Sequence, residues 1–473
     1  MDGLECSEVM ISQVRQYAPF RIDSHFYEKQ YEKLKLTLSH FRSASLKELV
    51  KKPIQTGHTP SMAVSSYYGG SIALIKTDNL HDNSISTVFS DYLTVEGNAV
   101  ISRTELAEKD IITTIIGATE HVIARSAIVT LEYLPSNINQ NIVQIRINCE
   151  KIAPEFVNIY LNTKYGKGYL VFLSRQTEQY NLNCREIEMV PIPLLSDNFQ
   201  KEIVRVVLDA QKYQNNSRMQ YKNAESILSE LIDIHTSLQN QPNFSVRKIS
   251  KSFVQTGRLD AEYYQSKYEA IVKKLNTRET VLSLCNLHDK NYNPDAKQTY
   301  QYIELADVGQ SGDISDVDIQ YGSDLPTRAR RIVKSGQVIV PSVEGSLQSC
   351  ALITDEYDGV LCSTGFYALD SDCINSETLL VLFKSEPIQT LMKQRCSGTI
   401  LTAISKDELL SMPLPMIDDD IQEKIAAKVQ ESFALRKQSK QLLEYAKQAV
   451  EMAIEQGEDV ALAWLKDKIP VEV

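Results

Sequence analysis

Two stretches of this chain, 222 residues apart, have nearly the same sequence. Pro191–Ile203 is PIPLLSDNFQKEI, and Pro413–Ile425 is PLPMIDDDIQEKI. Both prolines, one glutamine (Gln200 and Gln422) and the final isoleucine keep the same spacing in the two stretches. A repeated sequence usually encodes a repeated structural unit, so the chain is predicted to contain two units of the same kind.

A second pair of matching segments lies upstream in each half. Arg21–Leu34 (RIDSHFYEKQYEKL) and Arg258–Ile271 (RLDAEYYQSKYEAI) share an arginine, an aspartate, two tyrosines and a glutamate at the same spacing. Apolar and aromatic residues three and four apart predict a helix. A tyrosine pair with this spacing usually packs against a core, so we expect a structural role for it.

The middle of each half is rich in short β-branched segments. IITTII and IVQIRI in the first half, and QVIVPSV and GVLCSTGFYAL in the second, predict strands. Turn residues separate them in YYGGS, DNLHDNS, VGQSGD and CSGT. Helical stretches follow, such as APEFVNIYLNTKYG and SETLLVLFKSEPIQTLMKQ. Each half is therefore predicted to be an α+β domain of roughly 170 residues, an ordinary domain size.

A long amphipathic stretch follows each Pro-x-Pro motif. Proline ends the preceding element, and Asp197 and Asp418–Asp420 are suited to a helix N-terminus. The following stretches predict two helices of about 40 residues, each roughly 60 Å long. A narrow apolar stripe on a helix of this length requires a partner. An antiparallel pair meets that requirement, because the first helix leads to the second domain and the second helix returns.

These patterns predict an α+β fold with two similar globular domains separated by a pair of long antiparallel helices, a coiled coil. The internal repeat is expected to be pseudo-two-fold. The predicted boundaries are 1–195 for the first domain, 196–242 for the first long helix, 243–416 for the second domain, 417–457 for the second helix and 458–473 for a tail that packs near the N-terminus.

Composition limits the class of protein. A length of 473 residues with 43% hydrophobic and 23% charged residues is typical of a globular protein with two or more domains. No apolar run approaches the roughly 18 residues of a membrane span, and the acidic start MDGLECSEVM lacks a signal-peptide pattern. The eight cysteines show no CxxC or zinc-ligand spacing. We therefore expect reduced thiols and a cytoplasmic location.

The formal net charge of −11 disfavours extensive contact of the chain alone with nucleic acid. The charges of both signs are spread along the chain rather than gathered in one segment. Any binding to DNA is therefore expected to use local basic positions or a basic partner.

Several motifs occur in the same order over essentially the whole chain. They are TGHTPS and YYGGSIALIKTDNL, SRQTEQYNLNCREIEMVPIPL, TYQYIELADVGQSGDIS, and RCSGTILTAISKDELLSMPLPM, with a Q-x-x-I helix start closing each half. Together they resemble the specificity subunit of Type I restriction–modification systems. The second half departs from the first, because YIELADVG replaces the Y-x-GG stretch. TELAEKDIITTIIGATEHVI has only a loose counterpart, ARRIVKSGQVIVPSVEGSLQ.

The resemblance implies two target-recognition domains, each reading one part of a bipartite asymmetric site in double-stranded DNA. It implies two modification (methyltransferase) subunits and the restriction (translocase–nuclease) subunits as partners. The complex would methylate adenine and cleave DNA, while this chain would be a non-catalytic subunit. S-adenosylmethionine, Mg²⁺ and ATP would be held by the partners, and no cofactor or metal is expected in this chain.

The absence of common enzyme motifs from the sequence supports the non-catalytic interpretation. The sequence lacks an N-P-P-Y or D-P-P-Y methyltransferase tetrapeptide, a P-loop and an H-E-x-x-H zinc motif. Three alternatives stay open: the recognition subunit of a Type II-like combined restriction–methylation enzyme, a nuclease with a degenerate site, and a non-catalytic protein scaffold built on the helix pair.

Candidate DNA-binding residues are polar side chains on predicted loops, because base edges and phosphates are contacted by such donors and acceptors. Gln140 and Asn141 are suited to read adenine, and the RARR segment is interpreted as a phosphate clamp. The first-half candidates are Thr56, His58, Thr59, Ser61, Lys76, Thr77, Asn79, Gln140, Asn141, Arg175, Gln176 and Gln179. The second-half candidates are Arg328, Arg330, Arg331, Ser342, Ser346 and Gln348.

Overall fold

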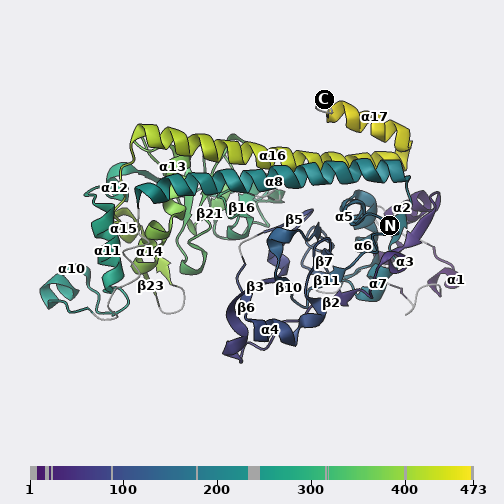
Figure 1. The fold of residues 1–473 in the computed structure, drawn as a ribbon, viewed down its shortest axis with the longest axis horizontal. Helices are drawn as coiled ribbons and strands as arrows, with labels where there is room; N and C mark the ends of the chain where they lie inside the picture. Colours follow the sequence, from purple (N-terminus) through teal and green to yellow (C-terminus); the bar gives the residue numbers. More distant parts are fainter. Residues whose placement is uncertain are drawn as a thin grey trace. The chain divides into compact units, whose positions relative to one another are not determined.

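The computed structural model describes residues 8–15, 21–22, 25–86, 89–176, 179–232, 245–314, 317, 319–398 and 402–469. The chain forms two compact units (Figure 1). The first comprises Met1–Tyr213 with Lys437–Val473, and the second comprises Gln214–Arg436. Each unit contains helices and sheets, so the predicted α+β class is confirmed. Each compact unit also includes one half of both long helices, which the predicted boundaries had set apart from the domains.

The first unit contains a four-stranded sheet of order β2-β11-β7-β9 and a three-stranded sheet of order β10-β3-β6, in which β10 and β3 are parallel. Its elements are α1 (Ile11–Val14), α2 (Lys29–Ser39), β1 (Ser43–Ser45), α3 (Leu46–Leu49), β2 (Gln55–Thr56), β3 (Tyr68–Ile75), β4 (Leu80–His81), β5 (Ser84–Ile85), β6 (Tyr92–Leu93), α4 (Val95–Val100), β7 (Ile111–Thr114), β8 (Ile116–Gly117), β9 (Ser126–Ile128), β10 (Ser136–Ile138), β11 (Ile142–Ile145), α5 (Pro154–Leu161), α6 (Lys164–Leu173), β12 (Arg175–Gln176), β13 (Tyr180–Asn181), α7 (Cys184–Glu188) and β14 (Pro191–Pro193).

The second unit contains two four-stranded sheets, of order β15-β22-β19-β20 and β17-β16-β21-β18, with β16 and β21 parallel. Its elements are α10 (Phe253–Thr256), α11 (Ser266–Leu275), α12 (Val281–Leu284), β15 (Asn286–His288), β16 (Thr299–Ile303), β17 (Ile319–Tyr321), β18 (Ala329–Ile332), β19 (Val338–Pro341), β20 (Ala351–Leu352), β21 (Leu361–Ser363), β22 (Phe366–Asp370), α13 (Ser376–Lys384), α14 (Glu386–Arg395), β23 (Cys396–Ser397), β24 (Ala403–Ile404) and α15 (Lys406–Leu410).

The sheet orders show that the internal repeat is structural. The strands β2, β11, β7 and β9 of the first unit correspond in order and pairing to β15, β22, β19 and β20 of the second. The turn before β7 and the turn before β19 also match. Lys109 and Gly336 both adopt positive φ, at 69° and 84°, and their N–H groups donate to Val129 O and Ile353 O at 2.8 and 2.9 Å. The loose sequence counterpart in the middle of each half is thus an equivalent segment.

The repeated Pro-x-Pro motif closes each globule in the same way. In the first unit Pro191 lies opposite Ser45 in the antiparallel pair β1–β14. In the second unit Pro413 lies opposite Thr280 in an antiparallel bridge. Ser45 and Thr280 are the N-caps of α3 and α12. Proline is tolerated here because a strand at a sheet edge needs no further ladder donor.

The repeated arginine of the upstream segments is a structural residue. In the first unit the Arg21 guanidinium lies 4.3 Å from the centroid of the Phe26 ring and donates to Ser174 O at 2.8 Å, at the end of α6. The Tyr27 hydroxyl donates a hydrogen bond to Arg21 O at 2.8 Å. The next tyrosine, Tyr31, is 5% exposed.

The second unit repeats this arrangement. Arg258 lies 4.3 Å from the Tyr263 ring centroid and donates to Cys396 O at 3.3 Å, at the end of α14. The Tyr264 hydroxyl donates to Arg258 O at 3.0 Å, and Tyr268 is 3% exposed. The predicted packing role of the tyrosine pair is therefore confirmed.

The two long helices are α8 (Asp197–Leu231) and α16 (Asp419–Gln456), with 35 and 38 residues. At about 1.5 Å per residue their lengths are about 52 and 57 Å. The described part of α8 ends before the predicted residue 242, and residues 233–244 lie outside the description. The helices are antiparallel in each unit. Ser439 Oγ donates to Ala210 O at 2.7 Å in the first unit, and Ser217 Oγ lies 3.1 Å from Ser432 Oγ in the second.

The predicted apolar stripes of both helices are largely buried. The exceptions are Leu231, which is 48% exposed, and five half-buried residues, Tyr213, Ile227, Ile421, Phe433 and Leu443. Leu442, beside Leu443, is buried. The predicted Ile234 lies outside the described residues. The buried positions are Ile203, Val206, Val207, Ala210, Tyr221, Ala224 and Leu228 on α8, and Ile425, Val429, Ala446, Ala449, Val450 and Ala453 on α16.

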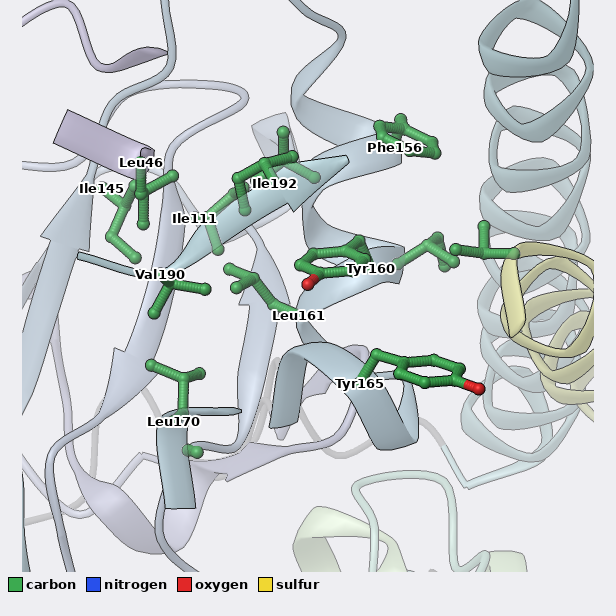
Figure 2. Close-up of a cluster of buried hydrophobic side chains, with 14 of the residues drawn as sticks. Leu46, Ile111, Ile145, Phe156, Tyr160, Leu161, Tyr165, Leu170, Val190 and Ile192 are labelled. Atoms are coloured by element: carbon green, nitrogen blue, oxygen red, sulfur yellow. The ribbon is translucent and has the colours of Figure 1, made fainter. Parts of the chain in front are cut away.

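The core of the first unit lies between its sheet and its share of the long helices. Figure 2 shows Ile111 and Ile145 from the sheet gathered with Leu46 and Val190. Tyr165 of α6 extends from this cluster to α16, where its hydroxyl donates to Glu455 Oε1 at 2.9 Å. These contacts fix the sheet relative to the helices within the unit.

The C-terminal helix α17 (Glu458–Lys468) packs on the same core. Ala461 and Leu465 are buried in it, and the half-buried Trp464 meets Tyr445 edge-to-face at 5.7 Å between ring centroids. The tail thus belongs to the first unit, as its predicted position near the N-terminus requires. Residues 1–7 and 470–473 lie outside the description.

Candidate nucleic-acid interface

In the first unit, two loops that are distant in sequence meet at one end of the sheet. The segment after β2 lies against the β10–β11 loop, since His58 N donates to Ile138 O at 3.1 Å. A Cβ on Gly57 would lie 2.1 Å from Ile138 O, so glycine is required for this approach. Thr59 Oγ1 donates to Gln140 Oε1 at 2.6 Å. His58 and Gln140 are exposed, and Thr59 is half-buried.

The neighbouring candidates are Thr56, Ser61 and Asn141. Thr56 lies in β2 opposite Val143 of β11, and Asn141 is half-buried at the start of β11. Ser61 is exposed two residues beyond Thr59. The structure therefore brings six of the predicted residues to neighbouring positions.

The turn after β3 has more internal contacts. Lys76 forms an ion pair with Asp91, and Asn79 is 6% exposed, with its Oδ1 accepting from Lys76 N at 3.0 Å. Thr77 lies between them and is half-buried. Asn139 N donates to Ile75 O at 3.1 Å, which places the turn beside the β10–β11 loop. Asn79 thus caps the turn, and the charge of Lys76 is neutralised by Asp91.

Arg175, Gln176 and Gln179 lie on or beside the β12–β13 hairpin and are exposed. Arg175 forms an ion pair with Glu186 at 3.1 Å. Backbone hydrogen bonds connect the segment after this hairpin to the β10–β11 loop. Leu182 N donates to Ile115 O and Ile115 N donates to Asn141 O, both at 2.9 Å. The first-unit candidates therefore occupy a connected stretch of backbone.

In the second unit, Arg328 and Ser342 meet at the β21–β22 loop. Thr364 N donates to Arg328 O at 2.8 Å, and Ser342 Oγ donates to Gly365 O at 2.9 Å. This loop occupies the position of Gln140–Asn141 in the first unit, because each lies between the equivalent strands. Thr364 and Gly365 were not among the predicted residues. Aligning the two halves of the sequence strand by strand would have identified Thr364 and Gly365.

The three arginines of the RARR segment differ in their surroundings. Arg331 is half-buried, donates to Phe366 O and lies 5.6 Å from the Tyr367 ring centroid. Arg330 donates to Thr327 O at 3.0 Å. Arg328 is exposed, and in the described part of the chain its side chain makes no hydrogen bond or ion pair. Arg328 is therefore the arginine of this segment best placed for a phosphate.

Ser346 and Gln348 follow β19. Ser346 Oγ donates to Val343 O at 3.2 Å within a 3-10 turn, and Gln348 is exposed, with its carbonyl accepting from the buried Lys384. Val343 forms a bridge with Ala403 of the β23–β24 hairpin. This pairing corresponds to that of β8 with β13 in the first unit. In each unit the segment that follows the equivalent strand, β7 or β19, thus pairs with the equivalent hairpin.

Most of the candidate residues carry hydroxyl, amide or guanidinium groups. No group of three His, Cys, Asp or Glu side chains among the described residues is arranged to hold a metal ion. Burial raises the pKa of the Cys350 and Cys362 thiols to about 12, which disfavours the reactive thiolate. None of the helices in the described ranges combines the length and apolarity of a membrane span.

Comparison with known proteins gives one curated relative of interest. The chain is 28% identical over 160 residues to the Type I restriction enzyme EcoBI specificity subunit of Escherichia coli. The match covers 34% of this chain and only 33% of that relative. No family model matches the chain.

Solved structures align over most of the chain at low similarity. The HsdS subunit of Thermoanaerobacter tengcongensis is 15% identical, with 88% of this chain and 97% of that chain covered and a TM-score of 0.30. The Type-I restriction-modification S subunit of M. genitalium is 13% identical, with 92% and 97% covered and a TM-score of 0.32. The sequence match relates this chain to the specificity subunits of Type I restriction–modification systems.

Proposed function

We propose that this chain is the DNA-specificity subunit of a Type I restriction–modification complex, with each unit reading one part of a bipartite, asymmetric site. The observation that carries the proposal is a repeated loop arrangement with different side chains. The first unit presents Thr59 and Gln140, and the second presents Arg328 and Ser342 beside Thr364. Two equivalent polar surfaces with different donors and acceptors are suited to two different short base sequences.

The chain itself would carry out recognition and no chemistry. Its candidate residues are amides, hydroxyls and guanidinium groups, which read bases and hold phosphates. Two modification subunits would supply adenine methylation with S-adenosylmethionine. The restriction subunits would supply ATP-dependent translocation and Mg²⁺-dependent cleavage, in the cytoplasm. The similarity to a specificity subunit and the two-fold sequence repeat support this division of labour.

The net charge of −11 sets an expectation for affinity. A chain without an extended basic face holds few phosphates by itself, so the isolated chain should bind DNA weakly and the complex strongly. Salt titration of both forms measures the difference. Specific nanomolar binding by the isolated chain at physiological salt would contradict the dependence on partners.

A domain exchange tests the proposal directly. Replacing residues 1–195 with the matching segment of a relative should change one part of the methylated site and leave the other part intact. A second chimera that exchanges residues 1–213 together with 437–473 keeps the whole first core from one parent. Sequencing of methylated bases in the host genome gives the readout for both chimeras.

The outcomes separate the competing functions. A continuous palindromic site, or a change in both parts after one exchange, would contradict a bipartite reader. A chain that assembles with methyltransferase subunits but protects no DNA would be a scaffold.

A further inference from the structure

The strand β11 has polar residues at both ends, and the end away from Gln140 is basic. Arg146 follows β11 directly. Its Nε and Nη2 donate to Asp110 Oδ1 and Oδ2, both at 2.7 Å. Gln144 Nε2 donates to Asp110 Oδ2 at 2.6 Å, and Asp110 is 1% exposed. The Asp110 carboxylate therefore forms an internal ion pair with Arg146 and fixes its guanidinium group.

Three more basic residues lie on segments near Arg146. Lys51 N donates to Arg146 O at 2.7 Å, and Lys52 Nζ lies 3.4 Å from Arg103 O, to which it donates. Lys51 and Arg103 are exposed, and Lys52 is half-buried. In the described ranges none of these three forms an ion pair. Burial, followed by the charge of Arg146, lowers the pKa of Lys52. Cations held together in this way favour an anionic ligand.

The basic cluster, defined as Lys51, Lys52 and Arg103, shares its strands with the candidate DNA-reading loop. Lys52 precedes β2 and Thr59 follows it, while Arg146 follows β11 and Asn141 precedes it. Asn141 and Arg146 are five positions apart along the strand, or about 17 Å at about 3.4 Å per residue. The major groove is about 12 Å wide. A loop placed in the groove would thus leave the cluster over the flanking phosphates.

The second unit has acidic residues at the equivalent position. Asp370 ends β22 as Arg146 follows β11, and it lies opposite Asn286 of β15. Asn286 Nδ2 donates to Asp370 Oδ1 at 3.1 Å and to Asp372 Oδ2 at 3.4 Å. His288 Nε2 lies 2.6 Å from Asp370 Oδ2. The second unit thus has the opposite charge at the position of Arg146.

We propose that the basic cluster is a phosphate-binding site that holds the DNA backbone beside the half-site read by the Thr59–Gln140 loops, and that the second unit has no such contact at the equivalent position. The inference rests on the proposed function. It makes the first unit the main source of electrostatic DNA binding in the chain, with the second unit depending more on direct base contacts.

The test uses the complex with its modification subunits and a DNA duplex that contains the methylated site. The triple variant Lys51→Gln, Lys52→Gln and Arg103→Gln should lower the salt slope of log Kobs by about 2 to 3, at about 0.9 per lost phosphate contact. Preference among half-site sequences should not change, because phosphates carry no base information. If the triple variant folds poorly, the double variant Lys51→Gln and Arg103→Gln, which retains Lys52, replaces it. The salt slope of this double variant should decrease by about 2.

A matched control removes the same charge elsewhere. Lys273→Gln, Arg278→Gln and Lys466→Gln alter three exposed cations outside the cluster. These changes should leave the slope within about 0.5 of wild type, because no phosphate contact is lost. In the opposite direction, Asp372→Lys adds a cation two residues beyond Asp370, the counterpart of Arg146 in the second unit. It should raise the slope by about 0.9 if DNA passes there as it does in the first unit.

Three results would overturn the inference. One is an unchanged slope in the triple variant while the wild-type complex binds its site. Another is an equal decrease in the control, which would indicate net charge rather than a site. The third is loss of the modification subunits from the triple variant with unchanged DNA binding by the assembled fraction, which would identify a protein-docking surface. Failure of the proposed function itself would look different, because the wild-type complex would then show no sequence preference.

Discussion

The Thr59 hydroxyl donates a hydrogen bond of 2.6 Å to the side-chain carbonyl of Gln140, a residue 81 positions away in the sequence. This bond orients an exposed amide at the tip of the β10–β11 loop. The Gln140 NH₂ group is thereby directed away from Thr59, and a fixed amide is a more selective base reader than a rotating one.

Replacing Thr59 with valine should relax the choice of base in one half-site. The variant loses the donor that orients Gln140 but keeps a similar shape, so discrimination should fall by about 1 kcal/mol, or roughly five-fold. Competition binding with single-base variants of the site measures this. Thr59→Ser keeps the hydroxyl and should behave as wild type; relaxed discrimination in that variant would show that the bond does not matter.

Arg328 and Arg331 should respond differently to the same substitution. Arg328→Gln should lower DNA affinity and reduce the salt slope by about 0.9 without a change in melting temperature, because its side chain is exposed. Arg331→Gln should lower the melting temperature, because this guanidinium donates to Phe366 O and packs on Tyr367. Equal melting temperatures for the two variants would contradict the inward placement of Arg331.

Leu228→Asp should destabilise the second unit by about 3 kcal/mol or more. Leu228 is 2% exposed on α8, and a carboxylate there would be buried without a partner. Leu208→Asp is the control on the same helix, since Leu208 is 49% exposed, and its effect should stay within about 0.5 kcal/mol. Urea unfolding compares the two variants, and similar midpoints would show that Leu228 does not lie in the helix interface.

The contact of Glu455 with α6 should make stability depend on pH. The hydrogen bond from Lys164, together with one from Tyr165, holds the pKa of Glu455 below its ordinary value of 4.5. A carboxyl with a lowered folded-state pKa stabilises the fold above the unfolded-state value, and this stabilisation is lost as pH falls through the lowered value. Wild type should therefore exceed Glu455→Gln in stability at pH 7, and the difference should disappear in more acidic solution. Denaturant midpoints at pH 7 and pH 3 measure it; a difference independent of pH would exclude the carboxylate as the cause.

A heptad inserted in both long helices should lengthen the unread spacer of the DNA site. The insertion points are between Tyr213 and Gln214 and between Arg436 and Lys437, where the two compact units divide. Seven residues add about 10 Å of helix and nearly preserve the helix face. Ten base pairs span about 34 Å, so the spacer should grow by about three base pairs. Methylation mapping should show both half-sites unchanged, and an altered half-site would contradict independent reading by the two units.

Much of the fold could be predicted from local sequence patterns. The spaced prolines, the Q-x-x-I helix start and the apolar stripe identified two α+β units and two long helices, since periodicity and repeats are visible along the chain. The repeat also predicted equivalent segments in the middle of each half, despite little identity between them. The described part of the first helix ends at Leu231, and its predicted end at residue 242 lies outside the described residues.

The candidate site needed the tertiary structure. The sequence marks RARR as basic, but a register irregularity between β18 and β21 at Ala329 and Arg331 decides which arginine faces inward. A shift of one residue in a strand moves a side chain to the opposite face.

The basic cluster shows the same limit more clearly. A backbone hydrogen bond joins Lys51 to Arg146, 95 positions away in the sequence, and the buried carboxylate of Asp110 holds the Arg146 guanidinium. Local patterns determined which elements form, because backbone preference and amphipathicity act over a few residues. Strand register and long-range packing decided which charges meet, because those contacts exist only after distant segments have come together.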